Sequence, residues 1–170
     1  SEYESLIKQG VFDLVDLPKD KKALKSRWVF KEKLNDQNQV VRYKARLVVK
    51  GYLQKEDIDY NDTFAPVAKF ASMNMLLSTA NEFDLELEQI DFDTAFLNAT
   101  VKEEIYMEQP EGYISDKYPK KVLRLRKALY GLKQAPYEWN AEIDTYLKSL
   151  GYNAIEADQC IYVKPSKSGK

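Results

Sequence analysis

Two runs of alternating residues, joined by a short polar turn, restrict the fold of this chain more than any other feature. Residues 27–34 and 40–49 are rich in β-branched and aromatic side chains, and the polar residues 35–38 lie between them. This pattern predicts a long β-hairpin. A cation stands at every other position of part of the second run, and a period of two places these cations on one face of the ribbon. They are Arg42, Lys44 and Arg46.

Short strands and helices are predicted on both sides of this hairpin. Helical spacing or helix-ending residues indicate helices at 2–9, 70–83 and 136–150. Strands are predicted at residues 11–15, 85–92, 105–107, 122–126 and 161–163. The order predicts an α+β fold with an antiparallel or mixed sheet. In the helix at 70–83, four apolar residues recur at helical spacing and are expected in the core: Met73, Leu76, Leu77 and Ala80.

The predicted strand at 85–92 leads into two carboxylates. If its alternation continues, Asp91 and Asp93 fall on the same inward side as the leucines of the strand. Burying a carboxylate there is costly unless it is paired or holds a metal. Two interpretations stay open: a metal or ion-pair site on the inner face, or a bulge near Gln89 that turns both carboxylates outward.

Charge is strongly segregated, although the formal net charge is only -1. Residues 21–55 carry 11 Lys and Arg against two acidic residues, whereas residues 56–93 carry ten acidic residues against Lys69. A second basic cluster at 120–133 includes Arg124 and Arg126. This pattern favours a groove for a polyanion beside a carboxylate site. The alternative is that these charges are the solvated outer faces of strands.

The rare residue types exclude several kinds of chemistry. The 170 residues include no His and a single Cys, so the chain has no Ser-His-Asp triad, no His-based metal site, no disulfide framework and no iron–sulfur cluster. Cys160 is expected to be a small buried apolar residue. The acidic loop at 51–66 either caps the next segment or binds a cation, although calcium-loop spacing is absent. We expect neither a membrane span nor a signal peptide, and the tail 164–170 is either a disordered end or a shortened hairpin loop.

Several segments resemble, in the same order, the motifs of copia-type (Ty/copia superfamily) retrotransposon reverse transcriptases, over about residues 10–163. The resemblance rests on Trp28-Val29-Phe30-Lys31, Arg42-Tyr43-Lys44-Ala45-Arg46-Leu47-Val48-Val49-Lys50-Gly51, Thr63-Phe64-Ala65-Pro66-Val67-Ala68, Gln89-Ile90-Asp91-Phe92-Asp93-Thr94-Ala95-Phe96-Leu97-Asn98, Glu104-Ile105-Tyr106-Met107-Glu108-Gln109-Pro110-Glu111-Gly112-Tyr113 and Leu129-Tyr130-Gly131-Leu132-Lys133-Gln134-Ala135-Pro136.

The resemblance implies a right-hand polymerase fold, with fingers followed by part of a ferredoxin-like palm. Residues 1–90 are then mainly fingers, with the helix at 70–83 leading into the palm, residues 91–163 are partial palm, and 164–170 are the tail. The implied activity is RNA-directed DNA synthesis from dNTPs on a primed template, with two Mg²⁺ ions (or Mn²⁺) as cofactors. The implied partners are an RNA template, a DNA primer, and the remaining palm, thumb and RNase H of a polyprotein. The implied location is intracellular, in the cytoplasm, a virus-like particle or the nucleus.

The same resemblance assigns roles to individual residues. Asp91 is implied as the catalytic, metal-binding aspartate, with the backbone carbonyl of Phe92 as a further metal ligand, and Asp93 as a structural neighbour. For the incoming dNTP, Arg46 would bind the triphosphate, Lys31 or Lys33 would assist, and Phe96 would lie under the sugar. A final group would position the template: Tyr130, Gly131, Lys133 and Gln134.

The family's paired-aspartate motif, Tyr-x-Asp-Asp, is expected shortly after residues 161–163, but this sequence contains no two adjacent Asp residues. Asp91 alone lacks about two of the carboxylates that a two-metal site requires. We therefore expect a fold truncated before that hairpin and little or no polymerase activity from the chain alone. Two alternatives remain: a nucleic-acid-binding remnant that relies on the cationic ribbon and on Arg124 and Arg126, or a non-functional piece with exposed apolar surface.

Overall fold

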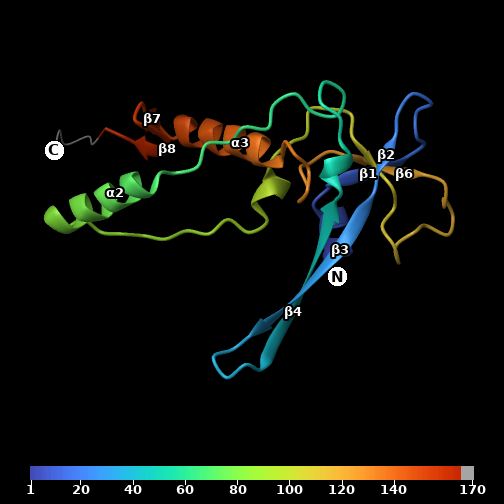
Figure 1. Cartoon of the computed structure of the whole chain (residues 1–170), viewed down its shortest axis with the longest axis horizontal. Coiled ribbons are helices and arrows are strands. Elements are labelled where there is room, and N and C mark those ends of the chain that lie inside the picture. Colours follow the sequence, from blue (N-terminus) through green and yellow to red (C-terminus); the bar gives the residue numbers. More distant parts are fainter. Residues whose placement is uncertain (166–170) are drawn as a thin grey trace. The chain divides into compact units, whose positions relative to one another are not determined.

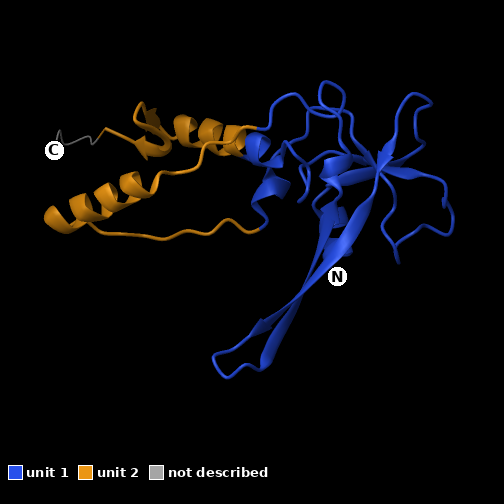
Figure 2. Cartoon of the chain, in the orientation of Figure 1, with its two compact units in different colours: residues 1–63, 94–139 blue, residues 64–93, 140–170 orange. Residues whose placement is uncertain are grey.

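A computed structural model describes residues 1–165 of the chain. It divides into two compact units, drawn in different colours in Figure 2. Unit 1 combines Ser1–Thr63 with Thr94–Trp139, and unit 2 combines Phe64–Asp93 with Asn140–Lys170. The long helix α3 (Ala135–Ser149) contributes its first residues to unit 1 and the others to unit 2.

A four-stranded mixed sheet forms the centre of unit 1, with its strands in the order β1-β6-β5-β2. β1 is Phe12–Val15, β2 is Ala23–Leu24, β5 is Tyr106–Met107 and β6 is Val122–Leu125. β6 is antiparallel to both β1 and β5, and β2 is parallel to β5. Helix α1 (Glu2–Lys8) precedes β1, and Gly10 allows the turn between them because its φ is +63°. The sequence predicted this mixed α+β architecture, although β2 was not among the expected strands.

The core of unit 1 lies under this sheet and under the base of the hairpin. Its members are apolar residues with almost no exposed surface, among them Leu6, Val11, Leu47, Val49, Leu97, Ile105, Met107, Leu123 and Leu129. Because Leu47 and Val49 belong to the second hairpin strand, the core fixes one end of the hairpin.

The predicted hairpin is confirmed and consists of β3 (Ser26–Leu34) and β4 (Val40–Val49), the two long antiparallel arrows of Figure 1. The Asn35 carboxamide oxygen accepts hydrogen bonds from the backbone N–H groups of Gln37 and Gln39, and Asn38 adopts a positive φ of 58°. Such a side-chain-to-backbone turn is typical of Asn. A short 3-10 helix, η1 (Gly51–Leu53), follows β4, and a second one, η2 (Ala95–Asn98), precedes β5.

Unit 2 contains helix α2 (Phe70–Glu82), the later part of α3, and a small hairpin of β7 (Asn153–Ile155) and β8 (Asp158–Val163). The expected helices at 70–83 and after Pro136 are therefore present, and α3 ends just before Gly151, whose φ is +87°. β8 extends the strand expected at 161–163, whereas β7 was not predicted. None of the helices among residues 1–165 has the length and apolar character required to cross a bilayer.

A buried carboxylate accepts a hydrogen bond at the N-terminal end of helix α2. Asp158, on β8, accepts hydrogen bonds from the backbone N–H groups of Lys69, at 2.9 Å, and of Cys160, at 3.0 Å. These bonds, the one from Lys69 above all, lower the pKa of Asp158. The stabilisation from this carboxylate is therefore complete above the ordinary Asp pKa of about 4, and it is lost as the pH falls through the lowered value.

Two predictions for unit 2 are wrong. Residues 85–92 form no strand and are exposed, because no segment among residues 64–93 and 140–165 pairs with them. Helix α2 buries only Ala80, whereas Met73, Leu76 and Leu77 are each about half exposed. An apolar stripe enters a core only where another element covers it. The exposed apolar surface expected of the non-functional alternative is therefore present in unit 2. Lys164 and Pro165 form no helix or strand, and the other tail residues lie outside the described part.

Candidate nucleotide and nucleic-acid site

The two faces of the β3–β4 hairpin differ in chemistry. Across the ribbon Val29 lies opposite Arg46, Lys31 opposite Lys44, and Lys33 opposite Arg42. Opposite residues of an antiparallel pair share a face. Six cations therefore line one face, which we call the cationic face: Arg27, Lys31, Lys33, Arg42, Lys44 and Arg46.

The positive charge of the cationic face is not neutralised within the described chain. Among residues 1–165, none of the six cations has a carboxylate within 4.0 Å. Glu32 lies on the opposite side of the ribbon, because its partner across the strands is Tyr43. Like charges held along one ribbon repel each other and attract a polyanion, so this face suits phosphate groups.

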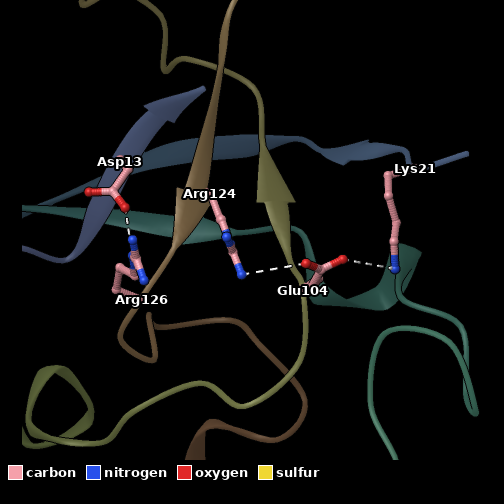
Figure 3. Close-up of polar contacts among 5 residues, drawn as sticks. All are labelled: Asp13, Lys21, Glu104, Arg124 and Arg126. Atoms are coloured by element: carbon pink, nitrogen blue, oxygen red, sulfur yellow. Dashed lines mark hydrogen bonds and ion pairs between the residues drawn. The ribbon is translucent and has the colours of Figure 1, made fainter. Parts of the chain in front are cut away.

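The second basic cluster has a different environment, shown in Figure 3. Arg126 pairs with Asp13 of β1 at 2.5 Å, and Arg124 of β6 pairs with Glu104 at 3.4 Å. The other oxygen of Glu104 lies 3.8 Å from Lys21. Strand pairing therefore brings carboxylates from distant segments against both guanidinium groups, and phosphate binding by Arg124 and Arg126 stays a prediction.

Three of the predicted dNTP and template residues meet within unit 1. The Arg46 guanidinium carbon lies 5.1 Å from the centroid of the Tyr130 ring, and the Phe96 ring approaches the same ring edge-on at 4.9 Å. The three residues come from β4, from η2 and from the segment before α3, so only the fold brings them together. The contact with the ring holds a planar guanidinium whose five donors suit phosphate oxygens.

Two glycines allow this segment to lie directly against the hairpin. A Cβ atom on Gly51 would stand 1.8 Å from the Gly131 carbonyl oxygen, and a Cβ on Gly131 would stand 2.1 Å from the Val49 carbonyl oxygen. Gly131 also has a φ of +95°, which favours glycine. The Val49 N–H donates to the Tyr130 carbonyl at 2.8 Å. The end of β4 and the Tyr130 segment are therefore locked together through their backbones.

Two buried side-chain amides, those of Gln54 and Gln134, add hydrogen bonds to this junction, and the role of Gln54 was not predicted from the sequence. The Gln134 side chain is fully buried, and its Nε2 donates to the Asp59 carbonyl at 2.9 Å. Gln54, which no motif singled out, donates to Gln134 Oε1 at 3.0 Å and accepts from the Lys133 N–H at 2.8 Å. The Lys133 ammonium donates to the Tyr60 hydroxyl at 2.9 Å. The Gln134 amide and the Lys133 ammonium are thus already engaged inside the fold, and they hold Tyr130 in position.

The predicted metal-binding segment belongs to unit 2. Asp91 and Asp93 are exposed and lie in no helix or strand, and Phe92 between them is about half exposed. Of the two interpretations of the sequence, burial on an inner face is wrong for both carboxylates. Thr94, the next residue, has a φ of 51°, which is unusual for a β-branched side chain.

The acidic residues do not complete a metal site. No group of three Asp, Glu or Cys side chains among residues 1–165 is close enough to hold an ion. In the acidic loop, the Asp59 carboxylate instead accepts a hydrogen bond from the Lys55 N–H at 2.8 Å. Mg²⁺ prefers several oxygen ligands, so the described residues do not fit a two-ion centre by themselves.

Comparison with known proteins agrees with the resemblance of the sequence. Residues 9–170 match the family described as reverse transcriptase (RNA-dependent DNA polymerase). The chain belongs to this family of nucleic-acid polymerases. No solved structure gives a significant match.

Plant retrotransposon proteins are among the similar sequences. The chain is 50% identical over 163 residues to the retrovirus-related Pol polyprotein of transposon TNT 1-94 from Nicotiana tabacum. It is 41% and 40% identical over 164 residues to those of transposons RE2 and RE1 from Arabidopsis thaliana. Each match covers 96% of this chain but only 11 or 12% of the polyprotein.

Proposed function

We propose that this chain forms the nucleotide- and template-positioning part of a retrotransposon RNA-directed DNA polymerase. The proposal rests on one observation, namely that the Tyr130 ring contacts both Arg46 and Phe96. In it, Arg46 binds the triphosphate of the incoming dNTP with help from Lys31, and Phe96 lies under the sugar. Tyr130 and Gly131 contact the template strand, while Lys133 and Gln134 hold them in place.

Asp91 is proposed as the metal-binding carboxylate of the same polymerase, with the Phe92 carbonyl as a second ligand. When bound, Mg²⁺ would stabilise the negative charge that develops during nucleotidyl transfer. The further carboxylates have to come from outside the described residues, since Asp91 belongs to no group of three acidic side chains. The division into fingers and partial palm, the RNA template, the DNA primer, and the thumb and RNase H partners are parts of the same proposal.

For the chain by itself we propose nucleic-acid binding without synthesis. Two observations support this second function: the unneutralised cationic face and the incomplete acidic ligand set. We expect no primer extension from the isolated chain with Mg²⁺ and dNTPs on a primed RNA template. Robust synthesis that is lost in Asp91→Ala would overturn this expectation.

A chimaera tests the polymerase proposal. The chain replaces the aligned 163 residues of the tobacco polyprotein, to which it is 50% identical, and primer extension is compared with that of the parent polyprotein. We expect activity in the chimaera, loss to background in Asp91→Ala, and a decrease of about a hundredfold in Arg46→Ala, because the developing phosphate charge loses a donor.

Matched controls keep the test specific. Asp62→Ala removes an exposed carboxylate of the acidic loop, and Arg126→Ala removes an arginine that is paired with Asp13. Both control chimaeras should keep the activity of the unmodified chimaera. Full activity of the Asp91→Ala chimaera would refute the assignment of Asp91, and full activity of Arg46→Ala would refute that of Arg46.

A further inference from the structure

Gln54 is a buried polar residue to which the proposed function gives no role. It is only 5% exposed, and it directly follows the short helix η1. Its backbone N–H donates to the Gly51 carbonyl at 3.0 Å, which closes that helix. Burying a primary amide is costly unless its oxygen and its nitrogen both find partners. The partners of the Gln54 side chain therefore indicate what this residue does.

The side chains of Gln54 and Gln134 form a hydrogen-bonded chain with one fixed direction. The Lys133 N–H donates to Gln54 Oε1 at 2.8 Å, and Gln54 Nε2 donates to Gln134 Oε1 at 3.0 Å. Gln134 Nε2 then donates to the Asp59 carbonyl at 2.9 Å. A backbone N–H can only donate and a backbone carbonyl can only accept, so the two ends decide how both amides are oriented. A side chain at position 54 that lacks either a donor or an acceptor would interrupt this chain.

Hydrogen bonds hold the Tyr130 segment at both ends. At its first residue, the Tyr130 carbonyl accepts from the Val49 N–H at 2.8 Å. Three residues later, the Lys133 N–H is bound by Gln54. Val49 belongs to β4, the strand that also carries Arg46. The backbone on both sides of the Tyr130 ring is thus fixed relative to β4, and the ring centroid lies 5.1 Å from the Arg46 guanidinium carbon.

We infer that Gln54 is a positioning residue of the nucleotide site. By binding the Lys133 N–H and the Gln134 side chain, it keeps the Tyr130 ring against Arg46. The guanidinium is then aligned before the triphosphate of a dNTP arrives. Gln54 contacts neither the dNTP nor the template, because its amide is buried and bonded within unit 1. The inference rests on the proposed function of Arg46 and Tyr130 and adds a residue that acts through them.

The test is the kinetics of single-nucleotide incorporation by the tobacco chimaera on a saturating primed RNA template. Gln54→Met keeps the length of the side chain but has neither the amide N–H nor the carbonyl oxygen. We expect the KM for the dNTP to rise by about tenfold, because Arg46 is aligned less well for the ground-state triphosphate. The value of kcat and the Kd for the primed template should stay within about twofold. Gln54→Asn keeps an amide on a shorter side chain and should raise the KM too, so the test does not depend on one variant folding.

Gln109 provides a matched control within unit 1. Its Nε2 donates to the Tyr118 and Lys121 carbonyls at 3.0 and 2.8 Å, and its Oε1 accepts from the Ser115 N–H at 2.8 Å. Gln109→Met therefore also removes the bonds of a fully engaged amide, but in another loop. It should lower the Tm of the chain about as much as Gln54→Met does, and it should leave the dNTP KM unchanged.

Two further measurements separate positioning from a general loss of stability. Tyr130→Ala should itself raise the dNTP KM, and adding Gln54→Met to it should change that KM by less than about twofold, because the ring that Gln54 positions is already gone. In the 170-residue chain, NMR hydrogen exchange of the Lys133 N–H should be at least about tenfold faster in Gln54→Met than in Gln109→Met.

Three kinetic outcomes would overturn the inference: an unchanged dNTP KM in both Gln54 variants, an equal rise in Gln109→Met, or full additivity with Tyr130→Ala. Failure of the polymerase proposal looks different. If Arg46→Ala abolishes extension while Gln54→Met keeps the normal KM, the role of Gln54 is refuted and the polymerase proposal stands. If the unmodified chimaera makes no DNA, the polymerase proposal falls together with the role of Gln54 in dNTP binding. Unchanged exchange of the Lys133 N–H in Gln54→Met refutes the positioning contact whatever the chimaera does.

Discussion

The β3–β4 hairpin and the β6 region of the sheet in unit 1 both carry cations at alternating positions. They differ in whether those cations have carboxylate partners. Arg124 on β6 and Arg126 just after it meet carboxylates from other segments. On the hairpin, cations from both strands gather on one face without a carboxylate within 4.0 Å among the described residues. A charge pattern therefore leaves a face open to an anionic partner only where the fold brings no neutralising neighbour.

The two regions also differ in what stabilises them, and the largest expected effect tests this difference. Leu123 is buried in the sheet core, whereas Val41 on β4 is 62% exposed. Leu123→Ala should destabilise unit 1 by about 2–5 kcal/mol because it leaves a cavity. Val41→Ala should change stability by less than about 0.5 kcal/mol. Guanidinium unfolding followed by the fluorescence of the two tryptophans of unit 1, Trp28 and Trp139, measures both, and equal losses would contradict the contrast.

The junction between the hairpin and the Tyr130 segment should be the next most sensitive. Gly131→Ala places a Cβ against the Val49 carbonyl and should cost about 1–3 kcal/mol through overpacking. It should also displace Tyr130 and lower the activity of the chimaera. Gly112→Ala is the control, since Gly112 has a φ of +82° but no atom within 4 Å of the new Cβ. A smaller loss of stability in Gly131→Ala than in Gly112→Ala would contradict the close backbone packing inferred for this junction.

The charge comparison is tested by two matched triple variants of the chain. The first removes Arg27, Lys31 and Lys33 from the hairpin, and the second removes Lys121, Arg124 and Arg126 near the sheet, all by substitution with Ala. The hairpin triple should bind a fluorescein-labelled single-stranded oligoribonucleotide of about 12 nucleotides at least about tenfold more weakly than the wild type, and its salt slope should fall by about 2. The sheet triple should bind nearly as the wild type, since its cations are paired. Similar losses in both would remove the distinction.

The smallest effect concerns the sheet ion pairs themselves. Arg126 and Asp13 are each about half exposed, so water screens their attraction. Arg126→Ala should therefore lower stability by less than about 1 kcal/mol, and the difference should shrink in high salt. Thermal unfolding at low and high ionic strength measures it. A salt-independent loss would indicate that the pair holds the sheet more strongly than an exposed ion pair does.

Most of unit 1 was predictable because its signals are local. Alternation in residues 26–49, the turn at Asn35 and the glycine after α1 each act within a few residues of the chain. The site was only partly predictable. Arg46, Phe96 and Tyr130 were identified from motifs, but Gln54 has no sequence signal, because its role depends on meeting Gln134 from 80 positions away.

Unit 2 was less predictable because its structure depends on contacts between segments that are distant in the chain. Periodicity located α2 and most of α3, yet it implied a buried stripe on α2 and a strand at 85–92. Burial and strand pairing both require a second element, and within residues 64–93 and 140–165 none covers these segments. The capping of α2 by Asp158 is another contact between distant residues that no local pattern contains.

The family, the two-faced hairpin and the positions of the main helices follow from the amino-acid sequence alone, since each rests on residue types at short spacing. It took the tertiary structure to show which cations have no carboxylate neighbour among residues 1–165, and which residues hold Tyr130 beside Arg46. These outcomes depend on contacts between segments far apart in the chain, and the free energy of such contacts is set by the neighbours that the fold supplies.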